Sequence, residues 1–196
     1  MNTLPNRIFF TGVPGSRWSG IAQIIEALPG FNTTDRTLER EYTHHEYSGH
    51  KGAYFGKSME FNAALDADYI DQAWTDPSAG TQLVKSHEWA HHIPHIHTWF
   101  PDDWIMLVYR KDDIAFDWWK QAGGFSIGYP SYASYRNDEG MRNEIHRQNC
   151  SMLKHALGTW ERFDAEWIER TFNLTTSHND FTIYEDIQVQ MIKRDS

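Results

Sequence analysis

The order of apolar and polar positions predicts strands that alternate with helices along most of the chain. Short apolar runs typical of strands occur at residues 8–10, 82–85, 104–109 and 181–184. Apolar residues spaced three or four apart, as on one face of a helix, occupy residues 18–28, 59–74, 112–122 and 138–172. We expect the last of these to be one long or broken helix. The polar stretches 31–56 and 126–137 are expected to be loops.

This alternation predicts an α/β fold of three layers, with helices on both faces of a central, mostly parallel sheet. Residues 104–109 form a nearly continuous apolar run. Such a run is typical of a strand buried on both faces in a parallel sheet, so we expect it at the centre. The 196 residues fit a single domain, 1–196, and no repeat or linker divides them.

Composition narrows the possible functions. The 18 basic and 27 acidic residues give a net charge of −9, which argues against a general electrostatic attraction to nucleic acid or an anionic membrane. The apolar fraction of 40% indicates a folded, soluble chain, and no apolar run approaches the roughly 18 residues of a membrane span. The single cysteine, Cys150, and the absence of a secretory signal pattern lead us to expect a cytoplasmic protein.

Three polar groups follow predicted strands. The glycine-rich segment 12–20 joins a strand to a helix, a P-loop-like geometry that presents backbone N–H groups to an anion, although it lacks the lysine of a Walker loop. Lys85 and His87 follow the second strand, and Arg110 follows the third. Taken singly, these features also fit an ordinary connector, two surface side chains and a salt-bridged arginine. In α/β sheets, however, ligands bind at the carboxyl ends of the strands.

Together the three groups resemble sulfotransferases that use 3′-phosphoadenosine 5′-phosphosulfate (PAPS). The sequence G-V-P-G-S-R-W-S at 12–19 is similar to the family's 5′-phosphosulfate loop, and K-S-H at 85–87 is similar to its K-T-H motif. Residues 110–119 resemble R-N-x-K-D-V-A-V-S-Y-Y with one residue deleted, and 181–186 resemble the late strand that ends in Y-E-D. The resemblance extends from Ile8 to Asp186.

The resemblance implies transfer of a sulfuryl group from PAPS to a hydroxyl of a small molecule or peptide, without a metal. His87 would be the base, and Lys85 would stabilise the bridging oxygen. Arg110 would hold the 3′-phosphate, beside the position occupied by Asp117. The loop residues that would hold the 5′-phosphosulfate are Gly15, Ser16, Arg17, Trp18 and Ser19. The segments 33–56 and 126–137 are candidates for acceptor binding. The oligomeric state is not indicated.

The chain departs from the family pattern in three places. Gly15 stands where the loop has a basic residue, while Arg17 stands where it has glycine, so the positive charge has moved two positions. Asp117 replaces the serine that contacts the 3′-phosphate and would repel it. Only ten residues follow Asp186, so we expect the family's C-terminal R-K-G segment to be missing. All three departures bear on donor binding.

Two other interpretations remain open. His87-Glu88-Trp89-Ala90-His91 satisfies the H-E-x-x-H pattern of zinc hydrolases, with His97 as a third ligand. Pro94 replaces the turn glycine of the extended pattern, and the segment before His87 has the character of a strand. Alternatively, the departures at Gly15 and Asp117 fit a non-catalytic sulfotransferase-like protein that binds nucleotide only.

Overall fold

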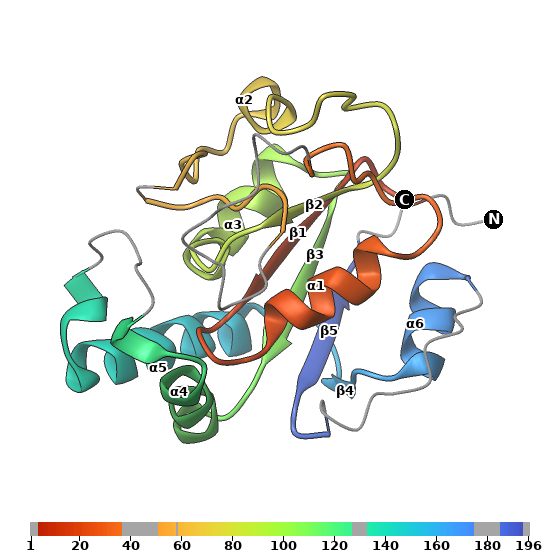
Figure 1. Cartoon of the computed structure of the whole chain (residues 1–196). Coiled ribbons are helices and arrows are strands. Elements are labelled where there is room, and N and C mark those ends of the chain that lie inside the picture. Colours follow the sequence, from red (N-terminus) through yellow and green to blue (C-terminus); the bar gives the residue numbers. More distant parts are fainter. Residues whose placement is uncertain (1–3, 37–50, 58, 127–132, 175–184, 194–196) are drawn as a thin grey trace.

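A five-stranded mixed sheet lies at the centre of the computed structural model, which describes residues 4–36, 51–57, 59–126, 133–174 and 185–193 (Figure 1). The strand order is β2-β1-β3-β5-β4. The bounds of the strands are β1 Arg7–Gly12, β2 Gln82–Lys85, β3 Trp104–Tyr109, β4 Glu161–Arg162 and β5 Gln188–Ile192. β1, β2 and β3 are parallel, whereas β5 and β4 join antiparallel. The predicted parallel centre is therefore confirmed.

Helices cover both faces of this sheet. α1 and α6 lie on one face, and α3, α4 and α5 pack on the other (Figure 1). The bounds are α1 Trp18–Glu26, α2 Ala67–Asp71, α3 Trp89–Trp99, α4 Asp112–Gln121, α5 Asp138–His155 and α6 Ala165–Phe172. Two short 3₁₀ turns, Gly124–Ser126 and Ala133–Arg136, precede α5. Within the described ranges, no helix is both long and apolar enough to cross a membrane.

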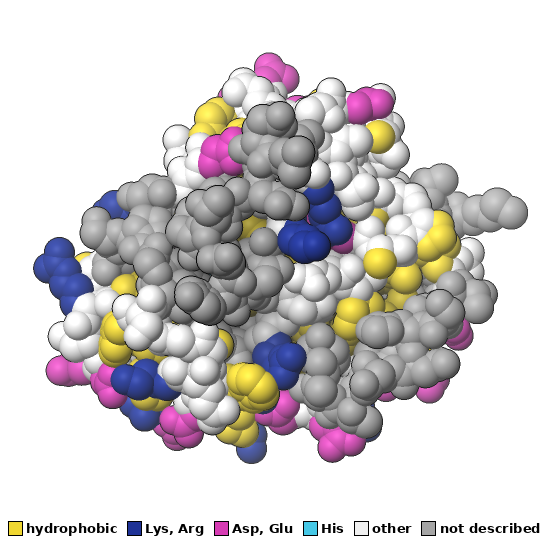
Figure 2. Space-filling model, in the orientation of Figure 1, with side chains coloured by type: hydrophobic (Ala, Val, Ile, Leu, Met, Phe, Trp, Pro, Cys, Tyr) yellow, Lys and Arg dark blue, Asp and Glu magenta, His cyan; other side chains and the backbone are white. Residues whose placement is uncertain are grey.

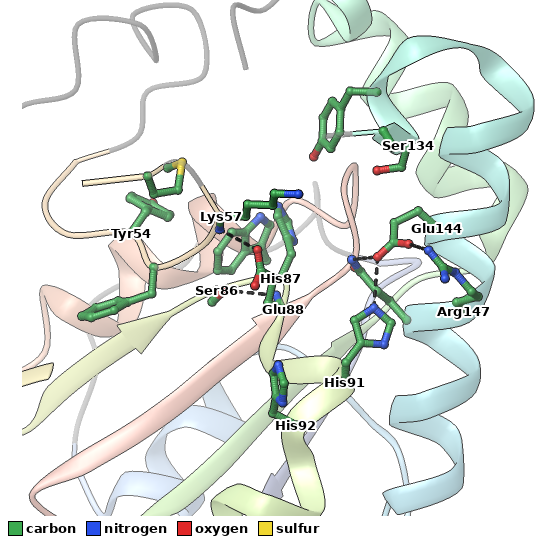
Figure 3. A pocket seen from close by; sticks show the side chains of 16 residues that line it. Tyr54, Lys57, Ser86, His87, Glu88, His91, His92, Ser134, Glu144 and Arg147 are labelled. Carbon is green, nitrogen blue, oxygen red and sulfur yellow. Dashed lines mark hydrogen bonds and ion pairs between the residues drawn. The ribbon is translucent and has the colours of Figure 1, made fainter. Parts of the chain in front are cut away.

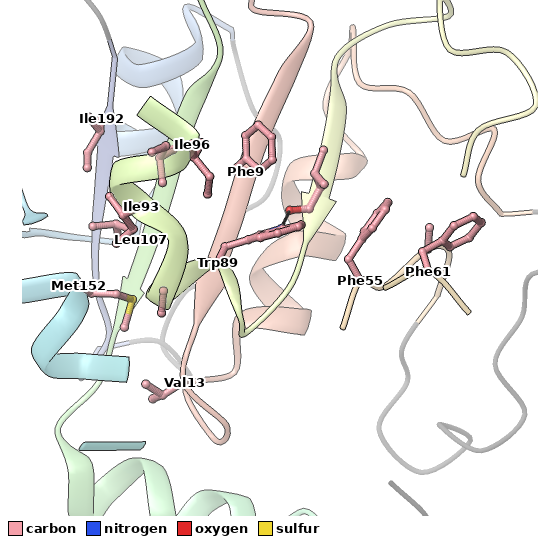
Figure 4. Packing of buried hydrophobic residues seen from close by; sticks show 14 of the residues in the cluster. Phe9, Val13, Phe55, Phe61, Trp89, Ile93, Ile96, Leu107, Met152 and Ile192 are labelled. Atoms are coloured by element: carbon pink, nitrogen blue, oxygen red, sulfur yellow. Dashed lines mark hydrogen bonds between the residues drawn. The ribbon is translucent and has the colours of Figure 1, made fainter. Parts of the chain in front are cut away.

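Two apolar cores, one on each face, hold the layers together. Side chains of successive strand residues point to opposite faces. In β3, Trp104, Met106 and Val108 join the core under α1 and α6, whereas Ile105 and Leu107 join the core under α3, α4 and α5. Figure 4 shows part of the core under α3, α4 and α5. Burial on both faces explains why β3 is an uninterrupted apolar run.

The helix expected over residues 59–74 is wrong for most of its length, because only α2 forms there. The segment before α2 pairs with a neighbouring loop instead: Gly56 donates a backbone hydrogen bond to Phe61 (2.9 Å). The side chain of Asp66 accepts a hydrogen bond from the Tyr69 N–H (2.8 Å) and so begins the helix at Ala67. In the segment before α2, Phe61 is buried, whereas Met59, Ala63 and Leu65 are partly buried and pack against the cores.

The chain between Asp138 and Phe172 is two helices, so the broken form of the expected helix is confirmed. β4 separates α5 from α6, and the side chain of Asp164 accepts a hydrogen bond from Trp167 N (2.8 Å) to cap α6. The sequence analysis did not anticipate β5, which pairs with β3. It also missed α3, where Pro94 lies inside the helix. The expected strand 181–184 lies outside the described residues.

The loop between β1 and α1 (residues 13–17) packs directly against α4 at Gly15. Gly15 has φ +80°, and a Cβ placed there would lie 1.8 Å from the carbonyl oxygen of Ala115. Only glycine can adopt this conformation and allow this close approach. The contact holds the loop against the helix that follows β3.

We expect Gly15→Ala to lower the free energy of unfolding by more than about 2 kcal/mol, because the left-handed conformation alone costs roughly 1–2 kcal/mol. Gly158→Ala is the matched control, since a Cβ there meets only the Gln190 side chain at 3.6 Å. Urea unfolding followed by circular dichroism measures both. Equal stability of the two variants would contradict the packing at Gly15.

Candidate active site

The three parallel strands end at one edge of the sheet and bring their following residues together. Gly12, Lys85 and Tyr109 are the last residues of β1, β2 and β3. His87 lies two residues after β2, and Arg110 directly follows β3. The β1–α1 loop lies between them, because β1 is the middle strand of the three. The sequence-predicted groups are thus gathered at the edge where ligands bind in such sheets.

The imidazole of His87 has a defined tautomer. Its Nδ1 is hydrogen-bonded to the backbone carbonyl oxygen of Gly12. A carbonyl oxygen only accepts, so Nδ1 carries the proton and the neutral ring has its lone pair on Nε2. Among the described residues, Nε2 has no hydrogen-bond partner. This arrangement leaves one nitrogen of His87 able to accept a proton.

Burial keeps the His87 ring neutral. The ring packs against the indole of Trp18, with 4.2 Å between the ring centroids. Loss of solvation lowers the pKa of His87 to about 4, although the Gly12 carbonyl and the charge of Glu144 oppose this effect. His87 is therefore unprotonated at neutral pH and available as a base.

A cavity of about 430 Å³ lies beside His87. Figure 3 shows Lys57, His87 and Glu88 on one side, and Glu144 and Arg147 of α5 on the other. Both segments expected to bind an acceptor contribute to its lining: Tyr54 and Phe55 come from the first, and Ala133, Ser134 and Tyr135 from the second. The volume falls in the range of small-molecule sites.

The β1–α1 loop contains a buried hydroxyl without a partner. Ser16 is fully buried, and its Oγ has no hydrogen-bond partner among the described residues. A Cβ at Gly12 would lie 2.8 Å from this oxygen, so glycine there makes room for it. The side chain of the N-cap residue, Arg17, makes no capping hydrogen bond to α1, which begins at Trp18 and continues through Ser19. A loop with these donors is suited to an oxyanion.

Arg17 and Arg110 converge on one tryptophan. Their guanidinium carbons lie 4.5 Å and 5.2 Å from the ring centre of Trp118. Burial lowers the pKa of Arg110, and the nearby charge of Arg17 lowers it further, against the effect of Asp186. Two cations are thus held beside the loop of a protein with net charge −9. On the face shown in Figure 2, Lys and Arg side chains are scattered among Asp and Glu side chains.

The carboxylate beside Arg110 is Asp186. Arg110 Nε donates to Asp186 (2.7 Å), and its Nη1 donates to the carbonyl oxygen of Gly15 (3.0 Å). Asp117, expected beside the 3′-phosphate, is exposed on α4. The α4 side chain that lies beside the two arginines is Trp118.

The amine of Lys85 lies in a buried ion network and does not line the cavity. Its Nζ pairs with Glu26, lies 3.7 Å from Asp35 and donates to the Lys51 carbonyl oxygen (3.2 Å). Arg36 pairs with Glu26 as well. Burial lowers the pKa of Lys85 to about 8, although Asp35 opposes the shift. The cavity is thus lined by His87 and not by Lys85, and the role of Lys85 at a bridging oxygen stays a prediction.

The H-E-x-x-H residues are not arranged like the ligands of a zincin. That site needs both histidines one turn apart on a helix, but α3 begins at Trp89, after His87. His87 binds the Gly12 carbonyl, whereas His91 Nε2 donates to Glu144 Oε1 (3.0 Å). Within the described ranges, no three His, Cys, Asp or Glu side chains group as metal ligands.

The sequence analysis missed the α5 side of the cavity and the backbone partner of His87. Glu144, Arg147 and Gln148 line the cavity from α5. Their spacing of three and four residues places them on one helix face, but a polar helix face is most often exposed to solvent. Only the tertiary packing of α5 against α3 distinguishes this face. The role of the Gly12 carbonyl is not visible in the sequence, because every residue has a backbone carbonyl group.

We expect Lys85→Met to lower the free energy of unfolding by about 3–5 kcal/mol, because it leaves Glu26 and Asp35 buried with too little positive charge. Lys120→Met, which removes a partly exposed pair with Asp138, is the control and should change stability little. Denaturant titration measures both. A small effect at Lys85 would contradict the structural role of the ion network.

We expect the imidazole of His87 to titrate near pH 4 in the folded protein. Because the unfolded chain has a histidine pKa of about 6.5, it binds the proton more readily, and the folded state loses stability as pH falls from 6.5 toward 4. Proton NMR measures the midpoint, and His87→Gln identifies the resonance. A midpoint near 6.5 would show that the ring is solvated.

Comparison of the chain with protein-family models, with curated proteins and with solved structures finds no match. The residues at the strand ends and their geometry are therefore the basis for a functional proposal. The imidazole of His87 and the β1–α1 loop, which contains the buried Ser16 hydroxyl, both lie at the end of β1. The cavity lies on the side of His87.

Proposed function

We propose that the protein transfers a sulfuryl group from PAPS to a hydroxyl acceptor. The observation that carries this proposal is the position of His87, whose unprotonated Nε2 has no partner in the described part of the chain and which lines a cavity of about 430 Å³. The sequence around it resembles the K-T-H motif of PAPS-dependent sulfotransferases. The geometry and the resemblance thus both support the proposal that His87 is the base.

In the proposed reaction, His87 Nε2 accepts the proton of the acceptor hydroxyl. The donor supplies the sulfuryl group: the bond from sulfur to the bridging phosphate oxygen breaks as the acceptor oxygen bonds to sulfur. The Gly12 carbonyl stabilises the imidazolium that results, because it accepts a hydrogen bond from Nδ1. Positioning and proton transfer are the two contributions expected from this histidine.

On the donor side, the β1–α1 loop would hold the 5′-phosphate. The buried Ser16 Oγ and the uncapped first turn of α1 offer neutral donors, and Arg17 offers a charged one. Hydrogen bonds to a charged group are about twice as strong as neutral ones. Arg17 would therefore replace the basic residue that the family has at the position of Gly15. Arg110, beside Arg17 at Trp118, would contribute positive charge to the 3′-phosphate.

Nucleotide binding without transfer is a second candidate, and one observation favours it. The Lys85 amine is fully buried among Glu26, Asp35 and the Lys51 carbonyl. In this arrangement it does not reach a bridging oxygen beside His87. A protein of this kind would bind the donor or its product through the loop and would lack turnover.

We expect the protein to bind 3′-phosphoadenosine 5′-phosphate (PAP) and to transfer radiolabelled sulfate from PAPS to a phenol such as 2-naphthol. His87→Gln keeps a side-chain donor for Gly12 but removes the base. It should lower kcat by about 10²–10⁴-fold and leave the Kd of PAP, measured by calorimetry, nearly unchanged. Arg17→Met should weaken PAP binding about ten-fold or more, because it removes a charge-assisted hydrogen bond.

His95→Gln is the control for the first variant, because His95 is exposed on α3 and does not line the cavity. PAP binding without transfer to any phenol or alcohol tested would favour the second candidate. Failure to bind PAP would contradict both. Stoichiometric zinc in the purified protein, lost on His91→Ala, would support the zinc-hydrolase interpretation instead.

A further inference from the structure

A second cavity, with a volume of about 310 Å³, is lined by α6, by the end of β5 and by residues 157–159. It shares no described lining residue with the cavity beside His87. It lies where β5 extends beyond β4, because β4 pairs only with Gln188 and Val189, whereas residues 190–193 line the cavity. Its volume falls at the lower end of the range of small-molecule sites. The proposed sulfuryl transfer gives this cavity no role.

Lys193, which directly follows β5, lines this second cavity and is partly exposed. Its Nζ donates a hydrogen bond to the carbonyl oxygen of Thr171 (2.6 Å) and lies 4.2 Å from the ring centre of Trp104. An ammonium group has three N–H donors, and in the described part of the chain only one of them has an acceptor. Two partners thus fix the position of the ammonium, while two donors are left for a ligand.

No carboxylate among the described residues compensates the charge of Lys193. The Thr171 carbonyl and the Trp104 indole are neutral, and burial lowers the pKa of the Lys193 amine without an opposing effect from a nearby carboxylate. This is unexpected in a chain with 27 acidic and 18 basic residues. A partly buried charge without an opposite charge is costly. A cavity beside such an ammonium therefore indicates a site for an anion.

The other charged groups in the wall of the second cavity compensate each other. Glu161 of β4 forms an ion pair with Arg170 of α6, and Arg170 also lies 3.8 Å from Glu166. The charge of Arg170 is thus taken up by carboxylates of the chain itself. In the described lining, Lys193 is the cation that is left for a bound anion. A ligand with a single negative charge matches this arrangement.

An amide and two apolar side chains define the rest of the second cavity. Gln190 Oε1 accepts a hydrogen bond from the Leu157 N–H (2.7 Å), and its Nε2 donates to the Thr159 carbonyl oxygen (3.3 Å). Both polar atoms of this amide are therefore used to hold residues 157–159. The side chain of Leu157 is 72% exposed, and Met191 is partly exposed. A ligand with an apolar body would remove this apolar surface from water, which is favourable.

We propose that the second cavity binds a small monocarboxylate with an apolar body, whose carboxylate accepts hydrogen bonds from the Lys193 ammonium. The apolar body lies against Leu157 and Met191. Hydrogen bonds between two charged groups are about twice as strong as those between neutral groups, so the charge of the ligand dominates its recognition. This site is separate from the proposed transfer reaction, and it stands or falls independently of PAPS binding.

The test compares phenylacetate with phenylacetamide, which has nearly the same shape and no charge. Binding of each compound to the full chain is measured by NMR titration. We expect phenylacetate to bind about ten-fold or more tightly, because only the carboxylate forms charge-assisted hydrogen bonds with Lys193. Lys193→Met should remove this preference. Lys154→Met is the matched control, since Lys154 is exposed on α5 and does not line the cavity, and it should retain the preference.

A second measurement on the unmodified protein applies even if Lys193→Met does not fold. NMR of the lysine ε-methylene groups follows the titration of Lys193. A bound carboxylate stabilises the charged amine, so phenylacetate should raise the pKa of Lys193, and phenylacetamide should leave it unchanged. Equal affinities of the two compounds, no binding of either, retention of the preference in Lys193→Met, or tighter binding of inorganic phosphate than of phenylacetate would overturn the proposal.

Discussion

The hydrogen bond between the Gly12 carbonyl and the His87 imidazole connects the sheet to the chemistry of the site. It forms because β1 and β2 are parallel and adjacent, with Phe10 opposite Lys85, so that the end of β1 meets the segment after β2. It puts the ring proton on Nδ1 and leaves Nε2 as the acceptor. Trp18, at the start of α1, then desolvates the same ring. The contact between the two strand ends thus determines the tautomer and the position of the candidate base, whereas burial of the ring keeps it uncharged.

Charge in this acidic chain is arranged in two separate sets with different roles. Lys85 and Arg36 neutralise Glu26 and Asp35 in a buried network at the C-terminal end of α1. Breaking such a network costs far more than its formation contributes, because a lone buried charge is left behind. Arg17 and Arg110 instead meet at Trp118, beside the end of β1. The first set stabilises the fold, whereas the second places two guanidinium groups beside the loop, one of which, Arg110, is also paired with Asp186.

The sequence predicts the centre of the fold well and the outer parts less well. β1 and β3 are found because strands buried on both faces consist of apolar runs, whereas β5 alternates glutamine with apolar residues and was not anticipated. α3 was missed because it contains Pro94 and several histidines. In the site, the positions of His87 and Arg110 after their strands follow from the sequence. The Gly12 carbonyl and the α5 wall do not, because they depend on tertiary packing.

The proposed function depends most on His87 acting as the base, with the acceptor in the adjacent cavity and the donor phosphate at the β1–α1 loop. A crystal structure with PAP and a phenolic acceptor tests this arrangement directly. We expect the 5′-phosphate at the β1–α1 loop, and the acceptor oxygen about 2.6–3.2 Å from His87 Nε2, with Nδ1 still donating to Gly12. A nucleotide bound away from the loop, or an imidazole turned away from the acceptor oxygen, would contradict the account.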